Sequence, residues 1–210
     1  MKKYIIFDFD GTIANTNDVI IESWQAAFIK YLGHTIPVEE IEMTFGETVE
    51  HTIKEKLPNE DWIEVRDFFR WYQAEECKAT IKLFDGITEM LDELKARGIR
   101  MATATSRTSK SYHEYMAALG LDKYFDVQVT MEDVSKHKPD PESALVALEK
   151  LGAKPEEAIM VGDTKFDIGC AENAGVDSVL IRWSHAVGEM QWTPTYEAEI
   201  PEDILEIIDK

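Results

Sequence analysis

Cysteine is scarce in this chain of 210 residues, which contains only Cys77 and Cys170. The two lie far apart, without the spacing of a metal site or a disulfide framework, so we expect free thiols in the reducing cytoplasm. Long hydrophobic runs are missing as well, since no apolar stretch approaches the roughly 18 residues of a membrane-spanning helix. The first apolar stretch ends at Asp8 without a cleavage site, which argues against a signal peptide.

Basic residues are much fewer than acidic residues. The chain has 22 Lys and Arg residues against 41 Asp and Glu residues, which gives a net charge of −19. So strong a negative charge repels polyanions, and it excludes nucleic acid and anionic membranes as expected partners. A small anionic substrate can still bind if local cations or a metal ion compensate the field at its site.

The N-terminal segment carries the most informative pattern. Residues 4–7 read Tyr-Ile-Ile-Phe, which is typical of a buried strand, and Asp8 and Asp10 follow directly. Open α/β sheets bind their ligands at the carboxyl ends of strands. Two carboxylates this close need either a proton or a cation between them. Gly11 leaves its backbone N–H open to an anion.

The order of the remaining elements predicts the fold. Residues 15–81 show helical spacing and no strand pattern, so we expect a small helical insert after the first strand. From residue 84 onwards strands alternate with helices, and we expect strands at 99–105, 125–130, 158–161 and 176–181. Together with the first strand, this predicts a doubly wound parallel α/β sheet. Residues 1–14 and 82–210 would form this Rossmann-like core.

Three further segments follow strands of the predicted sheet. The hydroxyls of Thr105 and Ser106 suit phosphate oxygens, or they cap the next helix. Lys138 lies beside two prolines and can neutralise phosphoryl oxygens, unless it is simply solvated. Asp163 can be a magnesium ligand, with Asp167 one helical turn later holding metal-bound water or the lysine. Alternatively, these two carboxylates stabilise the start of a helix.

These segments, taken in order, resemble the four motifs of the haloacid-dehalogenase-like hydrolases. The Asp8-x-Asp10-Gly-Thr pattern matches the first motif, and Thr105 matches the second. Lys138 matches the third motif, and Gly-Asp163-x-x-x-Asp167 matches the fourth in full. The resemblance covers nearly the whole chain.

Other segments of the chain fit the same family. The helical insert looks like its small, C1-type α-helical cap, and residues 181–185 look like the tail of phosphoglycolate-phosphatase-like members. The motifs and the cap type are shared with the β-phosphoglucomutase-like branch. One departure is Asn15, where many relatives carry Asp. This residue bears on how the insert is attached and not on the chemistry.

The resemblance implies a magnesium-dependent phosphatase that acts on a small phosphorylated metabolite. Asp8 would attack phosphorus and form an aspartyl-phosphate, while Asp10 would protonate the leaving group and then activate water. The Mg²⁺ ligands would be Asp8, the Asp10 carbonyl and Asp163. The phosphoryl oxygens would be bound by Gly11, Thr105, Ser106 and Lys138. Thr12 and Asp167 would support the metal ligands and the lysine without binding the substrate.

Rival functions can be weighed on the same residues. A haloacid dehalogenase has no need of Asp10. Mutases of the β-phosphoglucomutase type carry an arginine soon after a cap glycine, whereas Gly46 is followed here by Glu47 and Thr48. A catalytically silent binding module would be expected to have lost one of the motif residues, and none is missing.

The sequence says least about the substrate. Thr44, Phe45, Gly46 and Glu47 form the candidate specificity loop of the insert. Because residues 181–185 resemble phosphoglycolate-phosphatase-like members, phosphoglycolate is the first specific substrate that we predict. Residues 15–81 contain 14 acidic and 6 basic side chains, a net charge of −8, which does not favour a second anionic group on the substrate. A single well-placed Lys54, Arg66 or Arg70 can still bind a carboxylate. The positions of Arg107 and His137, which flank the motifs, are not predicted.

Overall fold

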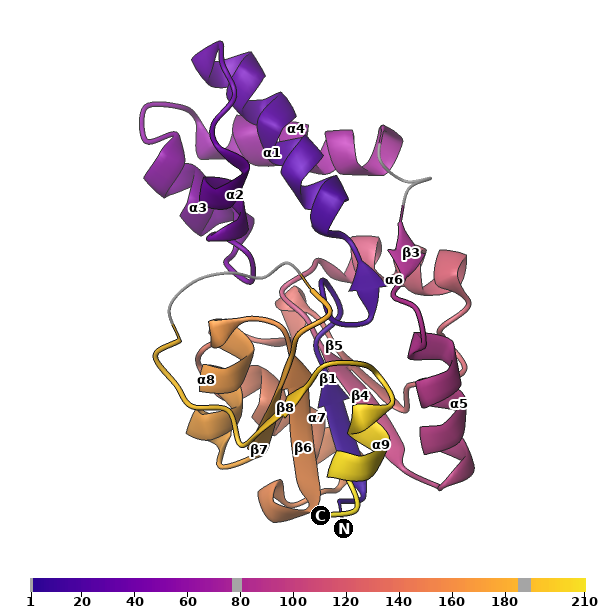
Figure 1. Ribbon diagram of the computed structural model, residues 1–210. Coiled ribbons are helices and arrows are strands. Elements are labelled where there is room, and N and C mark those ends of the chain that lie inside the picture. The colour runs from indigo at the N-terminus through magenta and orange to yellow at the C-terminus, as the bar shows by residue number, and fades with distance from the viewer. Residues whose placement is uncertain (1, 77–80, 185–189) are drawn as a thin grey trace.

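A six-stranded parallel sheet forms the centre of the protein (Figure 1). The computed structural model describes residues 2–76, 81–184 and 190–210. The strand order is β5-β4-β1-β6-β7-β8, with β1 (Tyr4–Phe7) in the middle. The other strands are β4 (Arg100–Ala104), β5 (Val127–Val129), β6 (Ala158–Gly162), β7 (Asp177–Ile181) and β8 (Tyr196–Ala198). This confirms the predicted doubly wound α/β fold.

The two faces of β1 separate two apolar layers. Ile5 and Phe7 point to the face covered by α5, α6 and α9, whereas Ile6 points to the face covered by α7 and α8. The side chains alternate in this way because successive residues of a strand point to opposite faces. The helices are α5 (Ile87–Ala96), α6 (Ser109–Leu119), α7 (Glu142–Leu151), α8 (Lys165–Ala174) and α9 (Asp203–Ile207).

The register of the parallel strands aligns the carboxyl ends of β1, β4 and β6. Phe7 of β1 pairs with Thr103 of β4 and with Val161 of β6. The residues that follow these strands therefore meet at the same edge of the sheet, as the sequence predicts.

The structure also contains strands that the sequence pattern missed. β8 is a three-residue edge strand, and β2 (Ala14–Asn15) pairs antiparallel with β3 (Lys82–Leu83). Strands this short give too few alternating positions for a pattern to emerge. The β2–β3 pair joins the two chain segments that enter and leave the helical insert, and Asn15 lies within it.

The helical insert lies beyond the carboxyl ends of the strands (Figure 1). Its helices are α1 (Asn17–Leu32), α2 (Val38–Glu42), α3 (Val49–Lys56) and α4 (Trp62–Glu75). They enclose an apolar cluster of their own around Trp24, Phe28 and Phe69. This separate cluster supports the division at residues 15–81, which remains a proposal. The helical spacing of the sequence predicts that the last helix of the insert runs towards Ala79, but this end of the helix and Cys77 lie outside the described residues.

Helix ends in the insert follow local chemistry. Gly33 directly follows α1 and has a left-handed φ of 78°. Glycine is the residue that most often adopts this conformation at the end of a helix. The side chains of Thr48 and Asp61 accept backbone N–H groups at the starts of α3 and α4. Among the described residues, no helix has the length and hydropathy needed to cross a membrane.

Two leucines of α7 allow a matched test of the packing. Leu148 is 3% exposed beneath the sheet, whereas Leu145 is 46% exposed. We expect Leu148→Ala to lower the free energy of unfolding by about 2–5 kcal/mol, because it leaves a cavity. Leu145→Ala changes the same helix and should stay within about 0.5 kcal/mol of wild type. Denaturant unfolding of both variants checks this, and equal losses would contradict the assigned layers.

Candidate active site

The site begins at the carboxyl end of β1, where Asp8 is buried and only 6% exposed. A tight turn follows, in which Gly11 has a φ of 72°. A Cβ atom at Gly11 would lie 2.2 Å from Oδ2 of Asp163, so only glycine fits there. The Gly11 N–H donates to the Ala14 carbonyl at 2.9 Å. Its expected contact with phosphate stays a prediction, and it would require this bond to be shared or replaced.

Lys138 joins two buried carboxylates. Its Nζ donates to Oδ1 of Asp8 at 2.7 Å and to Oδ1 of Asp167 at 2.6 Å. Burial alone would lower the pKa of Lys138, but the charges of Asp167 and Asp8 outweigh burial and raise it, so the ammonium stays charged. Asp167 also accepts the backbone N–H and the hydroxyl of Thr164 at the start of α8. It therefore holds the lysine and stabilises the helix start at once.

Asp163 completes a cluster of three buried carboxylates. Oxygen atoms of Asp8, Asp163 and Asp167 all lie within 4.8 Å of one another. Burial raises the pKa of Asp8 to about 7, and burial together with the charges of Asp167 and Asp8 raises the pKa of Asp163 well above its ordinary value. One ammonium cannot balance three carboxylates. An all-oxygen set of this kind fits a hard divalent cation such as Mg²⁺.

Two hydroxyls orient Asp163. Thr12 donates to Oδ1 at 3.3 Å and Ser184 donates to Oδ2 at 2.7 Å. Ser184 also accepts the side-chain amide of Asn17 at 3.2 Å, which links the start of α1 to this carboxylate. The sequence analysis did not predict this contact of Ser184, although it noted that residues 181–185 resemble a segment of phosphoglycolate-phosphatase-like members. His185 of the same tail lies outside the described residues.

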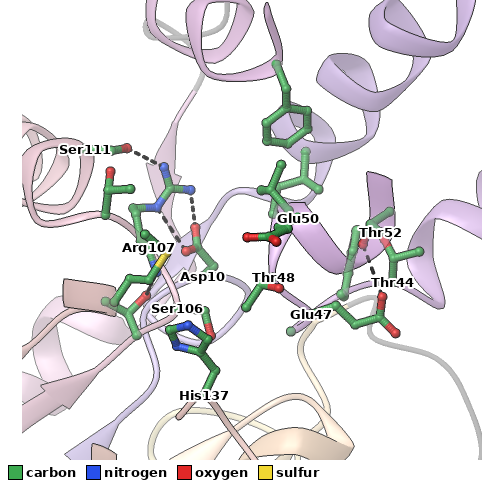
Figure 2. A pocket seen from close by; sticks show the side chains of 18 of the residues that line it. Asp10, Thr44, Glu47, Thr48, Glu50, Thr52, Ser106, Arg107, Ser111 and His137 are labelled. Atoms are coloured by element: carbon green, nitrogen blue, oxygen red, sulfur yellow. Dashed lines mark hydrogen bonds and ion pairs between the residues drawn. The ribbon is translucent and has the colours of Figure 1, made fainter. Parts of the chain in front are cut away.

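Asp10 stands apart from the three-carboxylate cluster and pairs with Arg107 (Figure 2). Nε of Arg107 lies 3.0 Å from Oδ2 of Asp10, and Nη2 contacts Oδ1. Arg107 is itself fixed by Ser111, 2.8 Å from Nη1, and by the ring of Tyr115. The sequence did not predict this pair. Its only signal is that Arg107 comes two residues after Thr105, at a neighbouring strand end. The Asp10 carbonyl as a metal ligand stays a prediction.

A cavity of about 360 Å³ separates this strand edge from the helical insert. From the core, the residues that line it include Asp8, Asp10, Thr105, Ser106, Lys138 and Asp163, with Arg107 and His137 beside them. All four residues of the predicted specificity loop, Thr44, Phe45, Gly46 and Glu47, line it from the insert. Figure 2 shows side chains of both walls pointing into the same space.

Gly46 marks where the insert touches the core. Its φ is 85°, and a Cβ atom there would lie 2.8 Å from both Oγ1 of Thr164 and Cδ2 of Phe166. Only a residue without a side chain allows this close approach. The loop is therefore seated next to Asp163 and closes one side of the cavity.

Comparison with known proteins agrees with this site. The family model for haloacid dehalogenase-like hydrolases matches residues 5–181. A relative named "Putative pyrophosphatase PpaX", from Caldanaerobacter subterraneus subsp. tengcongensis, is 38% identical over 206 residues, which cover 97% of this chain and 93% of the relative.

Solved structures extend the likeness to the whole fold. A "putative phosphoglycolate phosphatase" from Lactobacillus plantarum superimposes with a TM-score of 0.89 at 25% identity, covering 99% of this chain and 100% of that one. A "putative beta-phosphoglucomutase" from Thermotoga maritima gives a TM-score of 0.77 at 26% identity, covering 100% and 99%. As its four motifs predict, the chain is an enzyme that belongs to the haloacid dehalogenase-like hydrolases.

Proposed function

We propose that this hydrolase is a magnesium-dependent phosphatase that transfers a phosphoryl group from a small metabolite to Asp8 and then to water. The observation that carries the proposal is the buried cluster of Asp8, Asp163 and Asp167 around Lys138, beside a cavity of about 360 Å³. The free, buried thiol of Cys170 is compatible with the cytoplasm as the site of action.

The residues divide the reaction between them. An oxygen of Asp8 attacks phosphorus in line, a P–O bond forms, and the bond to the leaving oxygen breaks. Asp10 gives a proton to the leaving oxygen and then takes one from the water that hydrolyses the aspartyl-phosphate. Because Arg107 contacts both oxygens of Asp10, one of these contacts would have to be released before Asp10 carries a proton to the leaving oxygen. Lys138, Thr105 and Ser106 hold the phosphoryl oxygens as negative charge spreads over them.

The metal would be held by Asp8 and Asp163, with the Asp10 carbonyl as the third expected ligand. When bound, Mg²⁺ neutralises charge on the phosphoryl oxygens and on the carboxylates around it. Asp167 and Thr12 would keep their present partners, Lys138 and Asp163, and so hold these ligands in place.

Two substrates come first for testing. Pyrophosphate is favoured because a relative 38% identical along nearly the whole chain is named as a pyrophosphatase. Phosphoglycolate, the first guess from the sequence, is supported by a structural neighbour with that name at 25% identity. A phosphomutase is the second candidate function, because the Thermotoga maritima neighbour bears that name. A mutase would return the phosphoryl group to a sugar phosphate instead of releasing phosphate.

Removing the proposed nucleophile tests the function directly. We expect wild-type protein with Mg²⁺ to release phosphate from pyrophosphate and from p-nitrophenyl phosphate, and EDTA to abolish release. Asp8→Asn should lower kcat at least about a thousandfold, because the amide is a poor nucleophile. Asp122→Asn, an exposed change of the same kind, should keep full activity. Undiminished release by Asp8→Asn would refute the proposal.

The carboxylate cluster also predicts how stability depends on pH. Asp8 and Asp163 bind protons more tightly in the folded state than in the unfolded state, where their pKa is near 3.8. The stability of metal-free protein should therefore fall as pH rises from about 4 to about 7. Mg²⁺ should restore it at pH 8, where the carboxylates are ionised.

Asp163→Asn should reverse this penalty. The amide oxygen can accept from one of the hydroxyls of Thr12 and Ser184, and the amide nitrogen can donate to the other, while one buried charge is removed. In EDTA at pH 8 we expect Tm to rise by about 2–4 °C, which corresponds to about 1 kcal/mol for a chain of this size. The rise should be smaller at pH 5. Calorimetry at both pH values tests this, and a lower Tm for the variant at pH 8 would contradict the assigned repulsion.

A further inference from the structure

One face of α4 lines the same cavity as Asp8 and Asp163 of the carboxylate cluster. The residues of α4 that line the cavity follow one another at steps of four, three, one and three: Trp62, Arg66, Phe69, Arg70 and Gln73. Such steps keep side chains on one side of a helix. This wall combines two cations and an amide with aromatic rings, and nothing in the mechanism above uses it.

Arg70 differs from the other cations of the cavity in having no ion pair with a described carboxylate, although Asp67 and Glu132 act on its charge from a greater distance. Lys138 and Arg107 pair with carboxylates of the site, and Arg66 pairs with Asp67 at 2.7 Å. Within the described part of the chain, no carboxylate lies within 4.0 Å of the Arg70 guanidinium. The side chain is half-buried, and burial followed by the charge of Arg66 lowers its pKa. A half-buried, unpaired guanidinium is a ready partner for an anion.

Gln73 adds an unused amide one turn further along α4. It is only 8% exposed, and its side chain makes no hydrogen bond to any described residue. Because Gln73 lines the cavity, its side-chain amide is available to donate a hydrogen bond to an anionic group there.

Two acidic side chains of the insert also face the cavity, but each is already engaged. Glu47 accepts the hydroxyl of Thr52 at 3.1 Å, and Glu50 is paired with Lys54. Their charges are thus partly compensated. Arg70, by contrast, has no ion pair with a described residue, so its guanidinium is available to an anion in the cavity.

We propose that Arg70 and Gln73 bind a second anionic group of the substrate, on the leaving side of the phosphoryl group. The inference rests on the proposed function and narrows its substrate class to phosphate compounds with a nearby phosphate or carboxylate. Pyrophosphate and phosphoglycolate share this chemistry. Sugar phosphates with uncharged leaving groups do not.

Arg70→Gln tests the proposal through selectivity. For the substrate with a second anionic group that wild type prefers, pyrophosphate or phosphoglycolate, we expect kcat/KM to fall about ten- to a hundredfold, mainly through a higher KM. With p-nitrophenyl phosphate, which has no second anion, the change should stay below about threefold. Arg70→Lys should lose less than Arg70→Gln. Lys56→Gln, which removes a cation of the insert outside the cavity, should change neither substrate.

The outcomes separate the two proposals. If wild type releases phosphate through Asp8 and Mg²⁺ but Arg70→Gln lowers all substrates equally or none, the inference fails and the phosphatase stands. If release needs neither Asp8 nor Mg²⁺, the phosphatase proposal itself fails. Should Arg70→Gln not fold, Gln73→Ala provides the same comparison, and unchanged selectivity in that variant would overturn the inference.

Discussion

The structure depends on an imbalance of charge at the carboxyl end of the central strands. Three carboxylates, those of Asp8, Asp163 and Asp167, share a buried space with one ammonium, that of Lys138. Such an arrangement is stable only with protons or a cation in addition to the lysine. The register of β1 and β6, the bare backbone of Gly11 and the hydroxyls around Asp163 all hold these charges at fixed positions. Under the proposed function, a bound metal ion would compensate this excess of negative charge.

The cavity joins this charged edge to the helical insert. Cations and hydroxyls line it on the core side, where we propose that a phosphoryl group binds, and Arg70 and Gln73 of α4 line it on the insert side. Gly46 lets the insert approach the loop beside Asp163 closely, which brings the two walls together. Four cations line this cavity in a chain with a net charge of −19, but five carboxylates line it too, so under the proposed function a bound metal ion would also be needed to compensate the charge of an anionic substrate.

Sequence reasoning succeeded where topology decides position. Asp8, Thr105 and Asp163 follow parallel strands, and the ends of parallel strands meet, so their proximity could be predicted. It failed where side chains choose partners across the fold: nothing in the sequence pairs Arg107 with Asp10 or places Ser184 beside Asp163. It also failed for β2, β3 and β8, which are too short for a periodic pattern. Composition averages over a surface, so the net charge of the insert could not show that Arg66, Arg70 and Gln73 of α4 line the cavity.

Chemical trapping of the acyl phosphate tests the central claim most directly. Wild-type protein turning over substrate with Mg²⁺ would be quenched and reduced with borohydride, and its peptides analysed by mass spectrometry. Reduction converts an aspartyl-phosphate to homoserine, so the account predicts homoserine at position 8 only when substrate and Mg²⁺ are both present. Steady phosphate release with homoserine at another aspartate, or at none, would contradict the assignment of Asp8 as the nucleophile.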